Sequence, residues 1–246
     1  MKDNFSTRSS DYARFRPGYP PALFDFLFQN CRAFDTAWDC ATGNGQIAAA
    51  LAARFRRVIG TDISQNQLAN ALQCPNVEYR LEPAESSSLP ENSLDLITVG
   101  QAAHWFDFER FYPEVRRVLR PGGLLALVGY HLLKVDEPTD EIIHHLYRSV
   151  LGNYWDAERR YVDAAYANLP FPLTETAFPE MTMTYDWTRA HLLGYLGTWS
   201  AVQHFTKQNG CSPIDEALTN ALQQQWPDGV VKTVRFPIFG RIGIHH

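Results

Sequence analysis

The chain has few cysteines and no long apolar segment. Its four cysteines are scattered and form no Cys-x-x-Cys pair, which argues against a disulfide framework or a zinc site and favours free thiols in a reducing compartment. No apolar run approaches the roughly 18 residues of a membrane-spanning helix, and the polar N-terminus has no signal-peptide core. We therefore expect a cytoplasmic protein with no membrane partner.

The chain also lacks an excess of positive charge and any low-complexity tract. It has 22 Lys and Arg residues against 27 Asp and Glu residues, a formal net charge of −5, which argues against a nucleic-acid partner. Without single-residue tracts or repeats, it is neither a disordered chain nor a solenoid. Its 246 residues are 45% hydrophobic, enough to build the core of a single α/β domain spanning residues 1–246.

One stretch organises the rest of the sequence, AWDCATGNGQI at residues 37–47. A predicted strand leads to Asp39, and small residues follow at alternate positions, Ala41, Gly43 and Gly45, before an Ala-rich helix. Small residues let backbone N–H groups approach a ligand closely, and the N-terminus of the helix lies behind them. The stretch therefore predicts a turn that holds a nucleotide-like cofactor.

The glycines alone leave two cofactors open. The pattern Gly43-x-Gly45-x-x-Ala48 satisfies the loose dinucleotide fingerprint. The pattern Asp39-x-Ala41-x-Gly43-x-Gly45 resembles motif I of the class I S-adenosylmethionine (SAM) dependent methyltransferases, an acid followed by Gly-x-Gly-x-Gly, with Ala41 in place of the first glycine. A carboxylate at Asp39 can bind the SAM ammonium group directly or through water, whereas it would repel a pyrophosphate.

Acids and small residues further along fit the same cofactor. Asp62 ends a predicted strand at residues 57–62, where a carboxylate can accept hydrogen bonds from both ribose hydroxyls, and Ile63 is placed to lie against the adenine. The resemblance puts Ala84 and Glu85 at the adenine, with Glu85 accepting from the N6 amino group. Taken alone, Asp62 fits a turn acid and Glu85 a solvated loop carboxylate.

The acceptor side is predicted after the apolar strand at residues 94–99. The carboxyl end of a buried parallel strand borders the ligand crevice, which places Gln101 at the cofactor and His104 and Trp105 at the acceptor. His104 is the candidate catalytic residue, because imidazole can deprotonate or orient an acceptor, and the Trp105 indole can line a pocket or face the sulfonium. The alternatives are a structural histidine and a core tryptophan.

The N-terminal residues 1–21 form a candidate lid. Their Tyr-x-x-x-Arg-Pro-x-Tyr-Pro segment is similar to the methyltransferase type 11 group, with Tyr12, Arg16 and Tyr19 in matching positions. Arg16 can neutralise the SAM carboxylate, and Tyr12 and Tyr19 are the expected substrate contacts. The alternative is a frayed terminus.

The resemblance also implies the fold. Leu-Arg-Pro-Gly-Gly-x-Leu at residues 119–125 resembles a structural turn of the family. We expect a Rossmann-like, doubly wound, mostly parallel seven-stranded sheet with a C-terminal antiparallel hairpin. Residues 131–172 form a small helical cap and residues 173–240 complete the sheet. The neighbours His144 and His145 point about 100° apart on a helix and do not predict a metal site.

The sequence thus predicts transfer of the SAM methyl group to an oxygen, nitrogen, carbon or sulfur atom of a small-molecule acceptor. A looser similarity to trans-aconitate methyltransferase points to small acids. Two other classes stay open: an NAD-dependent oxidoreductase and a non-catalytic SAM-binding regulatory protein. A nucleic-acid methyltransferase is disfavoured because no Asn-Pro-Pro-Tyr or Asp-Pro-Pro-Tyr motif occurs.

Overall fold

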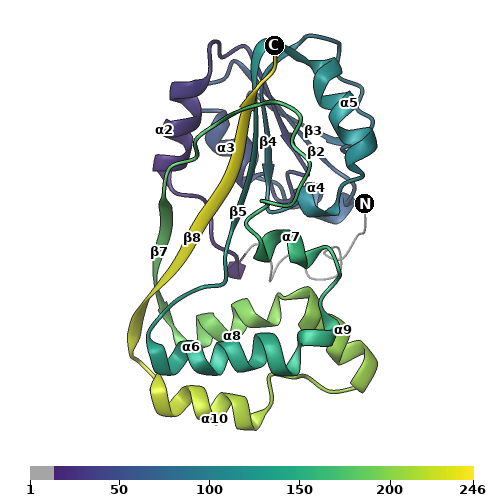
Figure 1. Cartoon of the computed structure of the whole chain (residues 1–246). Helices are drawn as coiled ribbons and strands as arrows, with labels where there is room; N and C mark the ends of the chain where they lie inside the picture. The colour runs from purple at the N-terminus through teal and green to yellow at the C-terminus, as the bar shows by residue number, and fades with distance from the viewer. Residues whose placement is uncertain (1–13) are drawn as a thin grey trace.

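An eight-stranded sheet runs through the computed structural model, which describes residues 14–246 (Figure 1). The strands are β1 Thr36–Cys40, β2 Arg57–Asp62, β3 Val77–Leu81, β4 Leu94–Gly100, β5 Leu119–Tyr130, β6 Thr174–Thr176, β7 Met181–Thr188 and β8 Val231–Ile244. The α-helices are α2 Pro21–Asn30, α3 Gln46–Leu51, α4 Gln65–Ala69, α5 Phe108–Val118, α6 Glu137–His144, α7 Arg159–Asp163, α8 Arg189–Gly197, α9 Ser200–Asn209 and α10 Glu216–Gln225. Shorter turns of helix are η2 Ala103–Trp105, η3 His145–Val150 and η4 Gly152–Tyr154.

The parallel half of the sheet positions the site. Strands β3, β2, β1, β4 and β5 lie side by side in that order and are parallel. From β1 the chain adds β2 and β3 on one side of the sheet and then returns to add β4 and β5 on the other side. The direction in which strands are added therefore reverses between β1 and β4. Ligands of such sheets bind at the carboxyl ends of the strands next to this reversal. The predicted doubly wound, mostly parallel fold is confirmed.

Helices cover both faces of the parallel strands. Alternate side chains of β5 point to opposite faces, and both sets are apolar and buried. Leu124, Ala126 and Val128 belong to one buried apolar cluster, together with residues of α2 and α3. Leu125 and Leu127 belong to the other, together with residues of α5. A strand covered on both faces reads as a continuous apolar run, as the sequence of this segment does.

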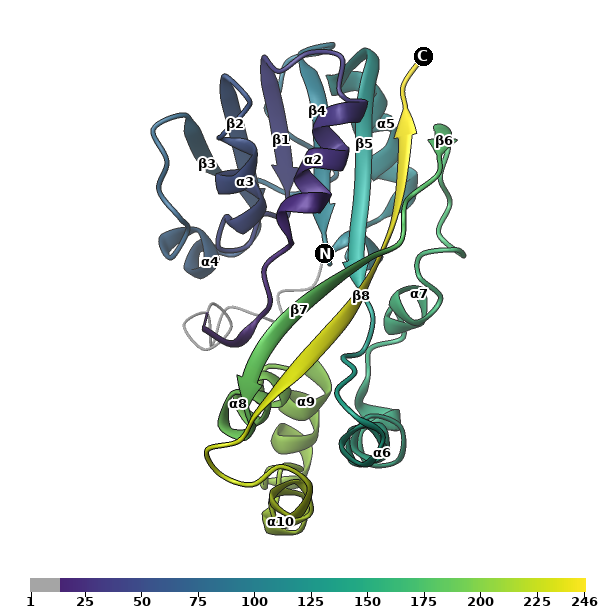
Figure 2. The ribbon, with the colours of Figure 1, turned by 90° about the vertical axis from the view of Figure 1, so that its left-hand side faces the viewer.

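The C-terminal part of the sheet differs from the expected seven strands. Strand β8 is fourteen residues long, and its second half pairs antiparallel with β5 and with the three-residue strand β6. Its first half pairs antiparallel with β7 and extends away from the parallel strands (Figure 2). The eighth strand is β6, a short edge segment whose side chains are all exposed and therefore leave no apolar pattern in the sequence.

The helical region is larger than the predicted cap at residues 131–172. Helices α8, α9 and α10 connect β7 to β8, so these strands do not form a tight hairpin. Together with α6 they gather beyond the end of the parallel strands (Figure 1). Leu192, Leu196 and Leu222 on these helices are fully buried and share a cluster with Phe236 of β8. The cap is thus completed by amphipathic helices from residues 189–225, because their apolar faces need this shared core.

Within residues 14–246, no helix combines the length and the apolar character needed to cross a membrane.

Candidate functional site

The stretch after β1 forms the turn that the small residues predicted, and its backbone is left-handed at three positions. Ala41, Gly43 and Gly45 have φ angles of 55°, 56° and 79°, all in the left-handed region. Glycine adopts this region freely, whereas Ala41 does so at a cost of about 1–2 kcal/mol, which explains why the family pattern has glycine there. A Cβ on Gly43 would meet nothing within 4 Å, and one on Gly45 would overlap the hydroxyl of Tyr79. The turn is therefore closely packed behind Gly45 and open above Gly43.

Asp39 lies beneath this turn instead of facing a ligand. It is 1% exposed. Its Oδ2 accepts hydrogen bonds from the Thr42 hydroxyl at 2.5 Å and the Ala48 N–H at 3.0 Å, and its Oδ1 accepts from the Thr98 hydroxyl at 3.0 Å. The carboxylate thus joins the end of β1, the turn, the start of α3 and β4. Three donors of the protein itself thus engage the two carboxylate oxygens of Asp39.

Asp62 connects the same turn to the end of β2. Its Oδ2 accepts from the Gly43 N–H at 2.9 Å and its Oδ1 from the Ser64 N–H at 2.8 Å. The side chain is 8% exposed, and the half-buried Ile63 follows it. These two contacts hold the Asp62 carboxylate between the turn after β1 and the start of α4.

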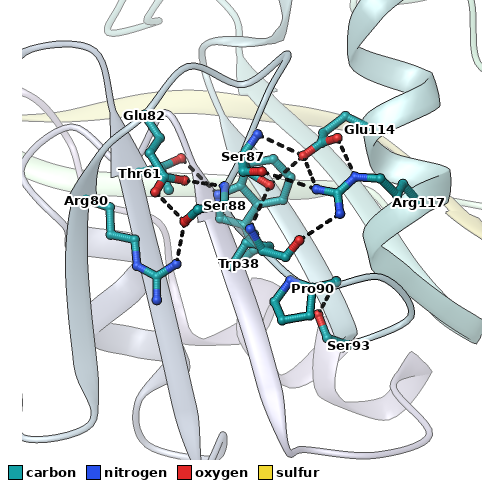
Figure 3. A network of polar contacts seen from close by, with 11 residues as sticks. Trp38, Thr61, Arg80, Glu82, Ser87, Ser88, Pro90, Ser93, Glu114 and Arg117 are labelled. Carbon is teal, nitrogen blue, oxygen red and sulfur yellow. Dashed lines mark hydrogen bonds and ion pairs between the residues drawn. The ribbon is translucent and has the colours of Figure 1, made fainter.

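The loop that carries Ala84 and Glu85 is held by a polar network (Figure 3). Glu82 accepts from the N–H and hydroxyl of Ser88 at 2.9 and 2.5 Å, and Glu114 of α5 accepts from the N–H and hydroxyl of Ser87 at 2.8 and 2.5 Å. Figure 3 also shows Arg117 of α5, which donates to the carbonyls of Leu89 and Ser87 and to Glu114. The sequence analysis did not identify these residues, although Glu114 and Arg117 stand three apart on a helix, the spacing of an ion pair.

Ala84 and Glu85 lie in different environments within this loop. Ala84 is 2% exposed and packs its methyl group into the core, so the loop presents its backbone there. Glu85 is half-buried, and its Oε1 accepts from the N–H of Asp107, the residue that caps α5, at 3.1 Å. The network and this contact fix the loop against α5.

A small hollow with a volume of about 40 Å³, which opens to solvent, lies at the carboxyl end of β4. We call it the acceptor hollow. Its lining includes Arg16, Gln101, His104, Trp105, Trp155 and Arg159. Gln101, His104 and Trp105, which the sequence predicted at the site, thus line the same hollow as the predicted Arg16 of the N-terminal segment. Trp155 and Arg159 come from the helical cap. Trp155 is one of the cap aromatics that the sequence offers for an acceptor pocket, whereas nothing in the local sequence marks Arg159.

Gln101 and the N-terminal segment form one side of the acceptor hollow. Gln101 has a φ of 53°, and its Oε1 accepts from the Tyr130 N–H at 2.9 Å. Arg16 donates to the hydroxyls of Thr198 at 2.9 Å and Tyr130 at 3.1 Å. Tyr19 packs edge-on against Tyr130 with ring centroids 6.2 Å apart. Of the candidate lid, residues 14–21 therefore pack near the hollow, whereas Tyr12 lies outside the described residues.

His104 is unsuited to the role of a general base. It is 6% exposed, and burial, with a smaller effect of Arg159, lowers its pKa to about 3. The imidazole is therefore neutral near pH 7 and a weak base. Its ring stacks at 4.7 Å from the ring of Trp105. Of the two roles predicted for His104, this environment fits the orienting role.

Tyr166 fixes the state of His104 and was missed by the sequence analysis. Its hydroxyl lies 3.2 Å from His104 Nδ1, and the phenol is fully buried. The backbone N–H groups of Ala103 and His104 act on the Tyr166 phenol to lower its pKa, against the effect of burial, as donors to its oxygen would. This favours the hydroxyl as the donor to Nδ1 and the tautomer with the imidazole proton on Nε2. Ala165 and Tyr166 have φ angles of 52° and 61°, a strained pair of the kind that clusters at functional sites.

Comparison with known protein sequences agrees with this geometry. A family model described as a methyltransferase domain matches residues 38–127. A Dictyostelium discoideum protein named as a methyltransferase is 35% identical over 244 residues, which cover 96% of this chain and 93% of that protein. A Mycobacterium bovis protein named as an uncharacterized methyltransferase is 38% identical over 130 residues, 52% of each chain.

Solved structures give the same result. A protein from Anaeromyxobacter dehalogenans, described as a type II methyltransferase, superposes with a TM-score of 0.86 at 40% identity and covers 94% of this chain and 98% of its own. The YcgJ protein of Bacillus subtilis shares the fold, with a TM-score of 0.53 at 23% identity over 92% of this chain and 98% of its own.

The burial of Asp39 predicts a pH dependence of stability. Burial raises the pKa of Asp39 to about 6 in the folded protein, against about 3.9 in an unfolded chain. The folded state binds more protons between these values, so the stabilisation from this carboxyl is complete below about pH 4 and is lost as the pH rises through about 6. Relative to Asp39→Asn, the wild-type free energy of unfolding should fall by about 2–3 kcal/mol between about pH 4 and about pH 7 in urea titrations. The exposed Asp25→Asn is the control, and a difference between wild type and Asp39→Asn that does not vary with pH would contradict the shifted pKa.

The contact of Tyr166 with His104 predicts a change of tautomer in Tyr166→Phe. The variant keeps the ring, which packs edge-on against Phe239 at 5.0 Å, but removes the proton donor to Nδ1. In ¹⁵N-histidine-labelled protein, the wild-type His104 should show a protonated Nε2 and an unprotonated Nδ1, and the variant a mixture of tautomers. His204, whose Nδ1 lies 2.9 Å from the Tyr154 carbonyl, should keep its shifts in both proteins. Identical His104 shifts in the two proteins would show that Tyr166 does not set the tautomer.

Proposed function

The chain belongs to the class I SAM-dependent methyltransferases, and from this membership we propose that it methylates a small carboxylic acid bound in the acceptor hollow. The dinucleotide interpretation of the turn is set aside, because SAM is the cofactor of this family. The proposal concerns the acceptor and the roles of the individual residues. It is supported by one observation: a permanently charged guanidinium and a neutral histidine line the same aromatic hollow.

The residues at the turn fit SAM. The space above Gly43 is open, an acid stands at the end of β2, and the backbone of the loop at Ala84 is fixed nearby by the network around Glu114. We assign Asp62 to the ribose hydroxyls, and Ile63, Ala84 and Glu85 to the adenine. We assign Gln101 and Arg16 to the amino-acid end, with Ala41, Gly43 and Gly45 giving the turn its shape. SAM supplies a methyl group that the sulfonium already activates.

The acceptor hollow fits an anion. The Arg159 guanidinium lies 4.8 Å from the Trp155 ring centroid, its Nε donates to the Tyr147 hydroxyl at 2.8 Å, and its side chain is 21% exposed. A guanidinium that other side chains hold in place can bind a carboxylate through two parallel hydrogen bonds. Asp156 also lines the hollow, and its carboxylate lies 3.8 Å from Nδ1 of His204.

An ionised carboxylate needs no base, which matches the low pKa of His104. With its proton on Nε2, His104 can donate a hydrogen bond to the acceptor and hold its oxygen in line for methyl transfer. Trp105 and Trp155 exclude water from the reacting atoms. In this proposal the protein contributes alignment and a dry environment, and Tyr12 and Tyr19 remain candidate acceptor contacts from the N-terminal segment.

Substitution of Asp62 tests the cofactor assignment. Asp62→Ala removes the acceptor proposed for the ribose hydroxyls, and we expect the affinity for SAM and S-adenosylhomocysteine to fall about 10- to 100-fold in calorimetric titrations. Asp62→Asn keeps one acceptor oxygen for the turn and should lose less. The exposed Asp25→Ala should bind as wild type does. If Asp62→Ala is folded by circular dichroism and binds SAM with unchanged affinity, the ribose contact lies elsewhere.

Substitution of Arg159 tests the acceptor class. Incubation with SAM and separate pools of small mono-, di- and tricarboxylates, phenols and amines should release S-adenosylhomocysteine with carboxylates. Arg159→Gln should raise the KM for the active acid about 10- to 100-fold, because it removes the paired charge. The neighbouring Arg160→Gln is the matched control, since Arg160 is exposed and bonds to Tyr161. Turnover of amines or phenols with no turnover of acids would refute the proposal. A protein that binds SAM yet methylates nothing in the screen would favour the non-catalytic alternative.

A further inference from the structure

A second hollow lies beside the acceptor hollow and is separated from it by Tyr147 and Arg159. It has a volume of about 600 Å³ and lies between the end of β5, the end of α6, η3 and α7. We call it the basic hollow. Its polar lining consists of His131, Lys134, His144, Tyr147, Arg148 and Asp163. Nothing in the proposed methyl transfer uses this space.

The basic hollow carries net positive charge in a chain whose net charge is −5. Among residues 14–246, the side chains of Lys134 and Arg148 form no hydrogen bond or ion pair. Asp163 is the acid in the lining, and it is already engaged: its Oδ1 accepts from the Tyr147 hydroxyl at 2.7 Å and lies 3.4 Å from Nε of Arg159. The charges of Lys134 and Arg148 are therefore not neutralised from within the hollow.

Ordered backbone places these cations. Lys134 is bridged to Arg235 by two backbone hydrogen bonds of 2.8 Å, one in each direction, which hold it next to β8. His144 and Arg148 are four residues apart where α6 passes into η3, a π-helical turn, and both line the hollow. Turns of this kind occur frequently at functional sites. The cationic side chains thus project from fixed positions on two separate segments.

The histidines that line the basic hollow, His131 and His144, fit a site for an oxyanion better than a metal site. His131 is half-buried and stacks on Phe239 at 4.7 Å, and burial lowers its pKa, so it is a neutral donor or acceptor. In the part of the chain that the structure describes, no three His, Cys, Asp or Glu side chains gather in a way that could hold a metal ion. Lysine and arginine donors with a neutral imidazole suit the oxygens of a phosphate or carboxylate group.

We propose that the basic hollow is a binding site for the oxyanion group of a small molecule, held by Lys134 and Arg148 and distinct from the acceptor hollow. This site does not depend on which acceptor is methylated, because its ligand binds to the protein without SAM or acceptor. Tyr147 connects the two hollows. It lines the basic hollow, and its hydroxyl accepts a hydrogen bond from Arg159, which lines the acceptor hollow.

Titrations of the cofactor-free protein at low ionic strength test the site, with inorganic phosphate, pyrophosphate and citrate as probes. We expect saturable binding of one pyrophosphate or citrate per chain by calorimetry, and weaker binding of phosphate. The double variant Lys134→Gln/Arg148→Gln should weaken binding at least about tenfold, because it removes the two unpaired cations. Arg16→Gln, which changes a cation that lines the acceptor hollow and not the basic hollow, should leave the affinity within about twofold and so separates the two sites.

The matched control is Arg56→Gln/Lys207→Gln. It removes the same net charge from exposed side chains elsewhere and should leave the affinity within about twofold. Comparison of pyrophosphate with citrate at equal ionic strength identifies whether phosphate or carboxylate oxygens are preferred. Binding that does not saturate, that survives the Lys134/Arg148 double variant, or that the control weakens equally would overturn the proposal. Loss of citrate binding in Arg16→Gln alone would assign citrate to the acceptor hollow and would also overturn it.

Discussion

A single buried carboxylate underlies the cofactor end of this molecule. Asp39 joins β1, the turn after it, the first turn of α3 and β4 through three internal donors. The left-handed residues of the turn are costly for Ala41, and α3 is only six residues long, so neither would hold its shape alone. Asp62 adds the connection to β2. Contacts within the protein therefore hold the shape of the turn, which lowers the ordering cost of binding a ligand there.

The acceptor end is assembled differently. Arg16, His104 and Arg159 come from the N-terminal segment, the end of β4 and the helical cap, and they meet in one hollow. Tyr166 and the strained backbone around it connect the cap to His104. The helical region thus influences which nitrogen of His104 carries the proton, although His104 itself lies in η2 just after β4. One family fold can thus keep its cofactor turn while the cap determines what is bound beside it.

The sequence predicted those features that depend on neighbouring residues along the chain. The strand at residues 57–62 was predicted with its observed bounds, and the turn predicted from Ala41, Gly43 and Gly45 is present. Sequence reasoning failed where partners are distant. The burial of Asp39 depends on Thr98, and the state of His104 depends on Tyr166, sixty-two positions away. No spacing rule encodes such contacts, and the exposed strand β6 left no pattern to recognise.

The pairing of β8 has a consequence for biosynthesis. Each contact between β5 and β8 joins residues more than a hundred positions apart, from Leu124 with Ile244 to Tyr130 with Ile238. The ribosome therefore completes β1 to β7 before β5 gains its outer neighbour. During that interval the nascent chain presents the open, apolar edge of β5, which is a template for pairing with another chain. Chaperone protection during translation would matter most while residues 131–230 are being made.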